Sequence, residues 1–222
     1  MILSFNRFLY KLNPYFYFKL KRAYIKIKAY ILINTNLYKN KIGDFEKCFI
    51  IGMPKTGTTS TSNFLKSYNS KHLTINPFTN RLYKKDDKTR LFEIIEKFNS
   101  FDDYPWYKID IIEETMKMDR NFVYIYTTRN PEIRFESAQR YREAKGLFRF
   151  NPKNKNKIIK KQIQHEKKCE LIAKKFKKKI LFIDVTTNPN SNEIIASFLG
   201  FKKIKDFPHS NKTSEYIFRR RV

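Results

Sequence analysis

The stretch 48–67 constrains the fold of this chain more than any other part of the sequence. It begins with an apolar run, residues 48–51, which predicts a short buried strand. A turn with glycines at Gly52 and Gly57 follows, and the hydroxyl residues 58–62 lead into a predicted helix. Strand, glycine loop and helix in this order can hold phosphate, because backbone N–H groups and the positive end of the helix dipole point at the anion.

The position of the lysine separates this loop from the nucleotide-triphosphate P-loop, which reads G-x-x-x-x-G-K-[ST]. Gly52 and Gly57 keep the glycine spacing, but Thr58 and Thr59 stand where the lysine and the Ser/Thr of that motif belong. The lysine comes early instead, at Lys55. The loop therefore predicts an anion site of phosphate type that differs from the one in nucleotide triphosphatases.

Composition is compatible with one domain that has a sizeable core. The chain has 222 residues, of which 41% are hydrophobic and 16% aromatic. Its formal net charge of +26 favours anionic partners such as an acidic polysaccharide, anionic lipid, nucleic acid or a phosphorylated cosubstrate. The abundance of Lys, Asn and Ile also fits AT-rich coding DNA, so charge by itself does not select nucleic acid as the partner.

Two cysteines, Cys48 and Cys169, give neither a disulfide framework nor a zinc pattern, which favours a reducing compartment. His165 and Cys169 are four residues apart and can share a helix face, but two ligands are too few for a metal site. We therefore expect no bound metal.

Residues 1–46 form a block of their own, rich in aromatic and basic residues, ahead of a predicted domain at 47–222. The block contains no apolar run of the about 18–20 residues that span a bilayer, and it lacks the pattern of a signal peptide. We expect a cytoplasmic protein. The block either lies as a basic amphipathic helix at the inner membrane face or packs on the domain as an ordinary amphipathic helix.

The rest of the chain alternates strands and helices. Apolar β-forming runs at 121–127 and 180–185 predict two more strands, and helical spacing separates all three. This pattern predicts an α/β fold of P-loop type, with a central parallel sheet between layers of helices and right-handed crossovers. We expect extended chain or a loop at 72–77 and a loop at 99–106. The predicted helices cover 59–68, 90–98, 107–118, 131–145, 151–180 and 190–199.

The helix predicted at 151–180 is the most basic segment, with twelve lysines against two glutamates. Its buried stripe is predicted to consist of Ile159, Ile163, Ile172, Ala173 and Phe176.

A second anion-binding group follows the strand at 121–127. Arg129 leaves the end of this strand, and Asn130 and Pro131 suit the first positions of a helix. Ser137 lies eight residues after Arg129, about two turns into that helix. Because ligands bind at the carboxyl ends of parallel strands, we expect Arg129 to lie beside the glycine loop, where its guanidinium can donate two hydrogen bonds to a phosphate.

These motifs together resemble the P-loop sulfotransferases that use 3′-phosphoadenosine 5′-phosphosulfate (PAPS). The resemblance covers residues 48–211 and extends to Asp103-Tyr-Pro105 and Phe207-Pro-His-Ser-Asn211. It implies that Arg129 and Ser137 bind the 3′-phosphate of PAPS. It also implies a 5′-phosphosulfate loop made of Lys55, Thr56, Gly57, Thr58, Thr59 and Ser60.

Two features depart from that family. Ser60 stands where its cytosolic members have a tryptophan that stacks on the adenine, and the late R-K-G element is missing. The run 219–221, three arginines, is a candidate substitute for that element, although a solvated basic tail is the alternative interpretation.

The resemblance implies transfer of a sulfuryl group to a hydroxyl or amine, with Lys55 stabilising the leaving phosphate. A general base must take the acceptor proton, and Asp103 is the first candidate, with Asp102 as its neighbour. His72 is the second candidate, because a histidine pKa suits neutral pH. The basic segments favour an anionic or membrane-held glycan as acceptor.

Two other functions are compatible with parts of the sequence. A nucleotide or small-molecule kinase predicts a magnesium-binding carboxylate at the end of a strand, and only Asp184 is placed for that role. A basic nucleic-acid-binding module agrees with the net charge but leaves the glycine loop and the Arg129–Ser137 pair unexplained. We therefore expect no nucleic-acid partner.

Overall fold

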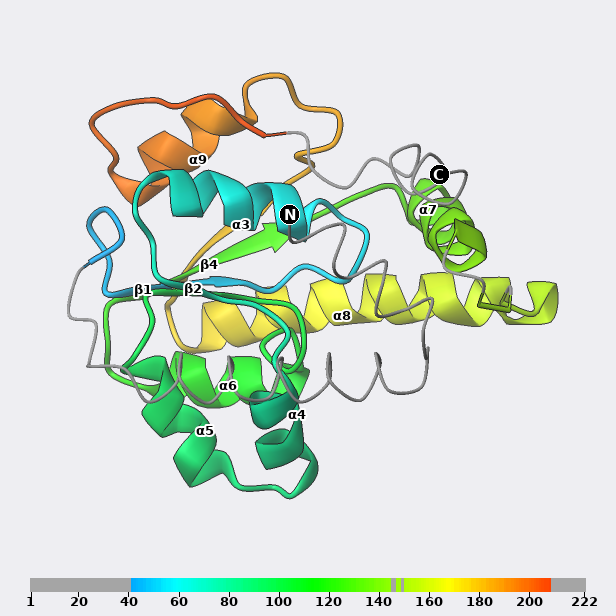
Figure 1. Cartoon of the computed structure of the whole chain (residues 1–222), viewed down its shortest axis with the longest axis horizontal. Helices are drawn as coiled ribbons and strands as arrows, with labels where there is room; N and C mark the ends of the chain where they lie inside the picture. The colour runs from blue at the N-terminus through cyan, green and yellow to red at the C-terminus, as the bar shows by residue number, and fades with distance from the viewer. Residues whose placement is uncertain (1–40, 145–146, 149, 209–222) are drawn as a thin grey trace, which may run out of the picture. The chain divides into compact units, whose positions relative to one another are not determined.

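A computed structural model describes residues 41–208 except 145, 146 and 149, and its centre is one parallel β-sheet (Figure 1). The sheet has five strands in the spatial order β2-β3-β1-β4-β5, and every pair of neighbours runs parallel. The α/β prediction with a parallel sheet is thereby confirmed. The strands are β1 (Lys47–Ile50), β2 (His72–Leu73), β3 (Ser100–Asp102), β4 (Phe122–Thr127) and β5 (Lys179–Ile183).

Two of these strands were not predicted. The stretch 99–106, expected to be a loop, contains β3, and the stretch 72–77, expected to be extended chain or a loop, contains β2. Both strands are too short to show a periodic pattern, and both exist through pairing. β3 hydrogen-bonds to β1, with Phe101 opposite Phe49, and β2 in turn pairs with β3. Their conformation depends on a partner strand distant in sequence, which local propensity does not register.

The predicted helices around the sheet are confirmed within a few residues. Asn130 caps α7 as expected, since its side-chain oxygen accepts hydrogen bonds from the amides of Glu132 (3.0 Å) and Ile133 (3.2 Å). Gly200 ends α9 in the left-handed conformation, with φ of 73°. These helices are α3 (Thr58–Ser67), α6 (Ile109–Lys117), α7 (Pro131–Ala144), α8 (Lys155–Lys175) and α9 (Ser191–Leu199), with a short 3-10 turn, Pro152–Asn154, before α8.

Residues 75–97 belong to a separate compact unit that contains α4 (Pro77–Lys84) and α5 (Lys88–Ile95). α4 was not predicted. Asn76 caps it by accepting a hydrogen bond from the amide of Phe78 (2.8 Å), and Pro77 takes the first helical position, where proline is tolerated. The helix predicted at 90–98 begins two residues earlier and ends three residues earlier than expected, as α5.

The two faces of the sheet bury different kinds of side chain. Figure 1 shows α3 and α9 on one face and α6 and α8 on the other. On the α3 side, Cys48 and Ile50 of β1 join an aliphatic core with Val123 and Ile125 of β4. On the opposite side Phe49 stacks on rings at centroid distances of 4.7–5.5 Å. This alternation follows from the period of two along a strand.

The strand order puts a topological switch point between β1 and β4. After β1 the chain passes through α3 to β2, on one side, whereas after β4 it passes through α7 and α8 to β5, on the other. In open parallel sheets the two loops that diverge at such a point leave a crevice outside the carboxyl ends of the strands. The loop 51–57 and the segment 128–130 leave the sheet at this switch point.

No helix in the described part of the chain is long and apolar enough to cross a membrane. The predicted extension 1–46 lies almost entirely outside the described residues, as do the arginines at 219–221.

The aromatic face of the sheet supports a first prediction. Phe49 is 1% exposed and contacts Phe101, Phe122 and Tyr124, so Phe49→Ala leaves a cavity in the core. We expect a loss of about 3–5 kcal/mol in the free energy of unfolding, measured by urea denaturation. Phe148, which is 92% exposed, provides the matched control, and Phe148→Ala should change stability by less than about 0.5 kcal/mol. Equal effects of the two substitutions would contradict this packing.

Candidate functional site

The loop between β1 and α3 curls back on itself before the helix begins. Lys55 and Gly57 both have left-handed backbones, with φ of 76° and 97°. Gly57 is the N-cap of α3, where no side chain caps the helix and the first turn contains no acidic residue. An uncapped helix N-terminus that faces a curled loop is a favourable place for an anion, because the backbone amides and the helix dipole act together.

Both glycines of the loop are required by close packing against neighbouring strands. A Cβ atom on Gly52 would lie 2.0 Å from the hydroxyl oxygen of Thr127, at the end of β4. A Cβ atom on Gly57 would lie 2.3 Å from a methyl carbon of Val185, just beyond β5. The loop therefore lies directly against the ends of the two neighbouring strands.

Thr56 ties the loop to β4. Its hydroxyl donates to the carbonyl oxygen of Met53 at 2.6 Å and lies 2.7 Å from the hydroxyl of Thr127. Since the single proton of Thr56 goes to Met53, Thr127 donates to Thr56. Both side chains are buried. The predicted ligand Thr56 thus has a structural role here, and its backbone amide is the part left for an anion.

Arg129 reaches the loop from the end of β4, as the sequence predicted. One of its terminal nitrogens, Nη1, donates to the carbonyl oxygen of Lys55 at 3.1 Å. Its Nε is buried and has no hydrogen-bond partner among the described residues. Burial lowers the pKa of Arg129, while the nearby Asp184 carboxylate raises it. The side chain therefore presents a buried donor at the loop with no acceptor from the described protein.

Ser137 lies on the face of α7 that is turned to the loop. Arg134, three residues before it, donates to the carbonyl oxygen of Pro54 at 3.2 Å. Tyr141, four residues after it, places its ring 3.3 Å from Lys55 Nζ. Residues at these spacings share a helix face, so the buried Ser137 lies between two side chains that contact the loop. The structure thus brings Ser137, Arg129 and Lys55 to one region.

Gln162 and Arg134 brace the site, and the sequence did not reveal either role. Gln162 of α8 donates to the carbonyl oxygen of Arg129 at 2.9 Å and accepts a hydrogen bond from Arg134 Nε. Both side chains are buried. The predicted stripe of α8 was wrong in part, because Ile163 is 41% exposed and Gln162 faces the interior. A glutamine amid lysines carries no apolar signal that would have identified an inward position.

Asp103 lies just beyond β3, whose neighbour in the sheet is β1. Its φ of 63° turns the chain, and its carboxylate accepts a hydrogen bond from the amide of Tyr104 at 2.8 Å. Burial raises the pKa of Asp103, and the nearby Asp102 raises it further, while Lys55 lowers it. Lys55 and Asp103 are therefore close enough to interact electrostatically.

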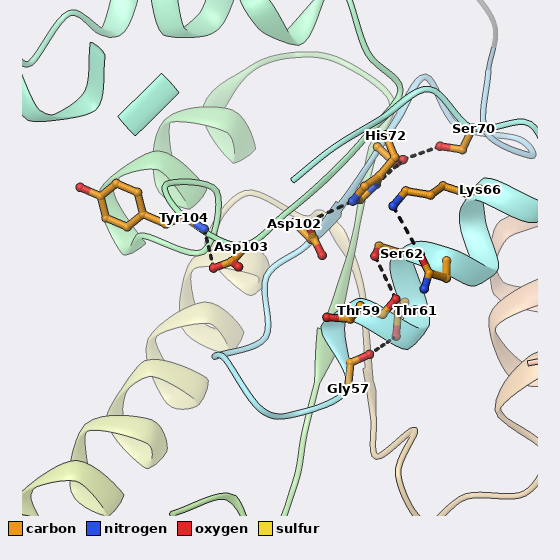
Figure 2. A network of polar contacts seen from close by, with 12 residues as sticks. Gly57, Thr59, Thr61, Ser62, Lys66, Ser70, His72, Asp102, Asp103 and Tyr104 are labelled. Carbon is orange, nitrogen blue, oxygen red and sulfur yellow. Dashed lines mark hydrogen bonds and ion pairs between the residues drawn. The ribbon is translucent and has the colours of Figure 1, made fainter. Parts of the chain in front are cut away.

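His72 and Asp102 form a separate buried pair, and Figure 2 shows Asp102 turned toward His72 and Asp103 turned away from it. His72 Nε2 lies 3.0 Å from the Asp102 carboxylate, and the two side chains are 0% and 4% exposed. His72 Nδ1 is 2.8 Å from the hydroxyl of Ser100, which also contacts Ser70. Nδ1 of His72 is thus hydrogen-bonded, and Nε2 is buried against the Asp102 carboxylate, so the geometry does not favour His72 as a direct proton acceptor.

The predicted hydroxyl ligands occupy the first turn of α3. Thr58 and Ser60 are buried, while Thr59 is half-buried and its carbonyl oxygen accepts a hydrogen bond from Ser62 at 3.0 Å. Figure 2 shows this turn and Gly57, with Asp102 and His72 nearby.

The carboxylate of Asp184, the candidate metal ligand of the kinase alternative, accepts hydrogen bonds from the amide and hydroxyl of Thr186. The described residues contain no group of three or more His, Cys, Asp or Glu arranged to hold a metal ion.

Gly57 supports a prediction about the loop. Gly57→Ala forces a side chain into a left-handed conformation and against Val185, so we expect it to lower the free energy of unfolding by about 2 kcal/mol or more. Val185→Ala removes the clash but not the backbone strain. Gly57→Ala should therefore cost less free energy of unfolding when it is introduced into the Val185→Ala protein than when it is introduced into the wild type. Urea denaturation of the four proteins measures this. Wild-type stability in Gly57→Ala would contradict the described loop.

Comparison with known proteins adds no family. No model of a known protein family matches this chain, and no curated protein matches it. The site combines three groups that suit an anion: a curled glycine loop, an uncapped helix N-terminus, and an arginine with a buried donor that lacks an acceptor among the described residues.

Proposed function

We propose that this protein is a sulfotransferase that moves a sulfuryl group from PAPS to a hydroxyl or amine of an acceptor and releases 3′,5′-ADP. One observation carries the proposal: the buried Nε of Arg129, without a partner among the described residues, lies beside the curled loop 52–57 at the switch point of the sheet. Two anion-binding groups at one crevice suit a cosubstrate with phosphates at both ends.

The two groups divide the cosubstrate between them. The loop residues Lys55–Ser60 bind the 5′-phosphosulfate through backbone amides, the Lys55 ammonium and the helix N-terminus, in a domain of P-loop type. Arg129 and Ser137 bind the 3′-phosphate. The glycines let the loop pack in this curled shape, since a Cβ at Gly52 or Gly57 would collide with Thr127 or Val185.

In the reaction, the bond from sulfur to the bridging phosphate oxygen breaks and a bond from sulfur to the acceptor atom forms. Negative charge develops on the leaving phosphate, and Lys55 together with the amides of residues 56–59 stabilises it. Lys55 Nζ contacts the Tyr141 ring before substrate binds, and we expect it to turn toward the phosphate. Arg129 and Ser137 hold the other end of PAPS, which fixes the orientation of the sulfur.

The acceptor proton passes to a base, which we assign to Asp103. Its carboxylate is half-buried, has a raised pKa and interacts with Lys55. A carboxylate with a raised pKa is a stronger base than one in water. Asp102 and His72 are buried against each other, so we give them a positioning role at the end of β3.

Ligand binding separates this proposal from its alternatives. We expect calorimetry to detect 3′,5′-ADP binding that Arg129→Ala weakens by a factor of ten or more, because a charged hydrogen bond contributes about 1.5–3 kcal/mol. Arg140→Ala is the control, since Arg140 is an exposed arginine of α7, the helix that begins two residues after Arg129. Binding of ATP with magnesium alone would favour a kinase, and tight binding of duplex DNA alone would favour a nucleic-acid-binding module. Either result contradicts the proposal.

Turnover of PAPS tests the base. We expect Asp103→Asn to lower kcat by about a hundredfold or more while 3′,5′-ADP binding stays unchanged. Because the pKa of Asp103 is raised, the acid limb of kcat/KM in the wild type should lie above the ordinary pKa of an aspartate. Asp102→Asn and His72→Ala should have smaller effects on kcat than Asp103→Asn. Full turnover in Asp103→Asn would show that Asp103 is not the general base.

A further inference from the structure

α8 (Lys155–Lys175), all of whose residues are described, has one buried and one strongly basic face. Gln162, Cys169 and Ala173 point inward. On the opposite side, within an arc of about 140° at 100° per residue, the exposed lysines form a band about 27 Å long. We name this band the α8 lysine face; it consists of Lys157, Lys160, Lys161, Lys167, Lys168, Lys174 and Lys175.

Acidic residues are segregated from most of this band. Only Lys174 and Lys175, at its C-terminal end, form ion pairs, with Glu170 and Glu113. Lys157, Lys160, Lys161, Lys167 and Lys168 form no ion pair with any described residue. By contrast, α6 carries Asp110, Glu113 and Glu114, and the exposed side of α7 carries Glu132, Glu136 and Glu143. A band of unneutralised like charges is a favourable surface for an extended polyanion.

The chemistry of the band distinguishes among polyanions. It contains no arginine, whose planar fork suits phosphates, and no aromatic ring on which bases could stack. The band therefore lacks the side chains that typically recognise nucleic acid. Leu171, 66% exposed, is its only apolar side chain, whereas a helix that lies in a membrane interface needs a wide apolar face. The ammonium groups of lysines lie on flexible side chains and attract negative charge without requiring a fixed geometry. This suits a linear chain of carboxylated or sulfated sugars.

The inner face of the same helix is part of the site. Gln162 hydrogen-bonds to the carbonyl oxygen of Arg129 and to Arg134, which contacts the loop at Pro54. Gln162 lies between Lys161 and Lys167 along the helix, so the middle of the band is attached to the residues that hold Arg129. A chain bound along the band lies on the opposite side of α8 from Gln162, across a helix about 10–12 Å in diameter, and so contacts the element that positions Arg129.

We propose that the α8 lysine face binds an acidic polysaccharide, and that this polysaccharide is the acceptor of the sulfuryl group. The binding of the polysaccharide to α8 is inferred from the distribution of charge. That the bound polysaccharide is the acceptor rests on the proposed function. The proposal names the substrate class as a polymer of hydroxyl-bearing, negatively charged sugars.

The test is binding of fluorescein-labelled polygalacturonate, measured by anisotropy over a range of salt concentrations. One variant replaces Lys160, Lys161, Lys167 and Lys168 with glutamine, which keeps the helix propensity. Its matched control, with the same change in charge, replaces Lys84, Lys85, Lys202 and Lys203, all exposed outside α8. We expect the α8 variant to bind about tenfold or more weakly, with a shallower salt dependence, and the control to change by less than about twofold.

Equal losses in the two variants would overturn the proposal, because net charge would then explain the binding. So would absence of polygalacturonate binding, or tighter binding of a DNA duplex or of phosphatidylserine vesicles that the α8 substitutions abolish. Binding of 3′,5′-ADP, measured in the same variants, should be unchanged. If the wild type binds polygalacturonate through α8 but does not bind 3′,5′-ADP, the docking surface is supported and the sulfotransferase proposal fails. If it binds 3′,5′-ADP but not polygalacturonate, the sulfotransferase proposal is supported and the docking surface fails.

Discussion

The parallel pairing of β1 with β4 is the interaction on which the rest of the site depends. It brings together loops that are more than seventy residues apart in the sequence. The amide of Ile51 continues the pairing by donating to the carbonyl oxygen of Ile125 at 2.9 Å, so the glycine loop begins in register with the end of β4. Without this register, Arg129 could not reach the carbonyl oxygen of Lys55.

A network of buried polar groups then holds the crevice in one shape. Arg134 is a buried guanidinium, and burial lowers its pKa, because an ion loses its hydration in the interior. Pro54 and Gln162 provide fixed acceptors that offset this loss. The guanidinium of Arg129 also loses hydration through burial, but its Nε has no hydrogen-bond partner among the described residues. An anion that accepts from this nitrogen meets a donor already in position, so little ordering remains when it binds.

The positive charge of this protein is unevenly distributed over its surface. The sequence permits two explanations of the net charge of +26, a functional one and a compositional one. A compositional bias adds lysines to exposed positions in general. It does not by itself keep glutamates out of one arc of a helix, whereas on α8 both Glu166 and Glu170 lie outside the arc that holds the seven exposed lysines. Substitution inside and outside that band distinguishes the two explanations.

The sequence by itself determined the fold class, the three longest strands, most of the helices and the glycine loop, because these depend on local periodicity and on residues with special backbone conformations. Only the tertiary structure decided the rest. β2 and β3 are strands because they pair, and Gln162 faces inward because Arg134 and the backbone of Arg129 need partners. His72 is buried because it lies against the Asp102 carboxylate and its Nδ1 is hydrogen-bonded to Ser100. The sequence ranked Asp103 first among the candidate bases, with Asp102 as its neighbour and His72 second. Burial and hydrogen bonding separate them, since both depend on contacts between segments about thirty residues apart, which no local pattern encodes.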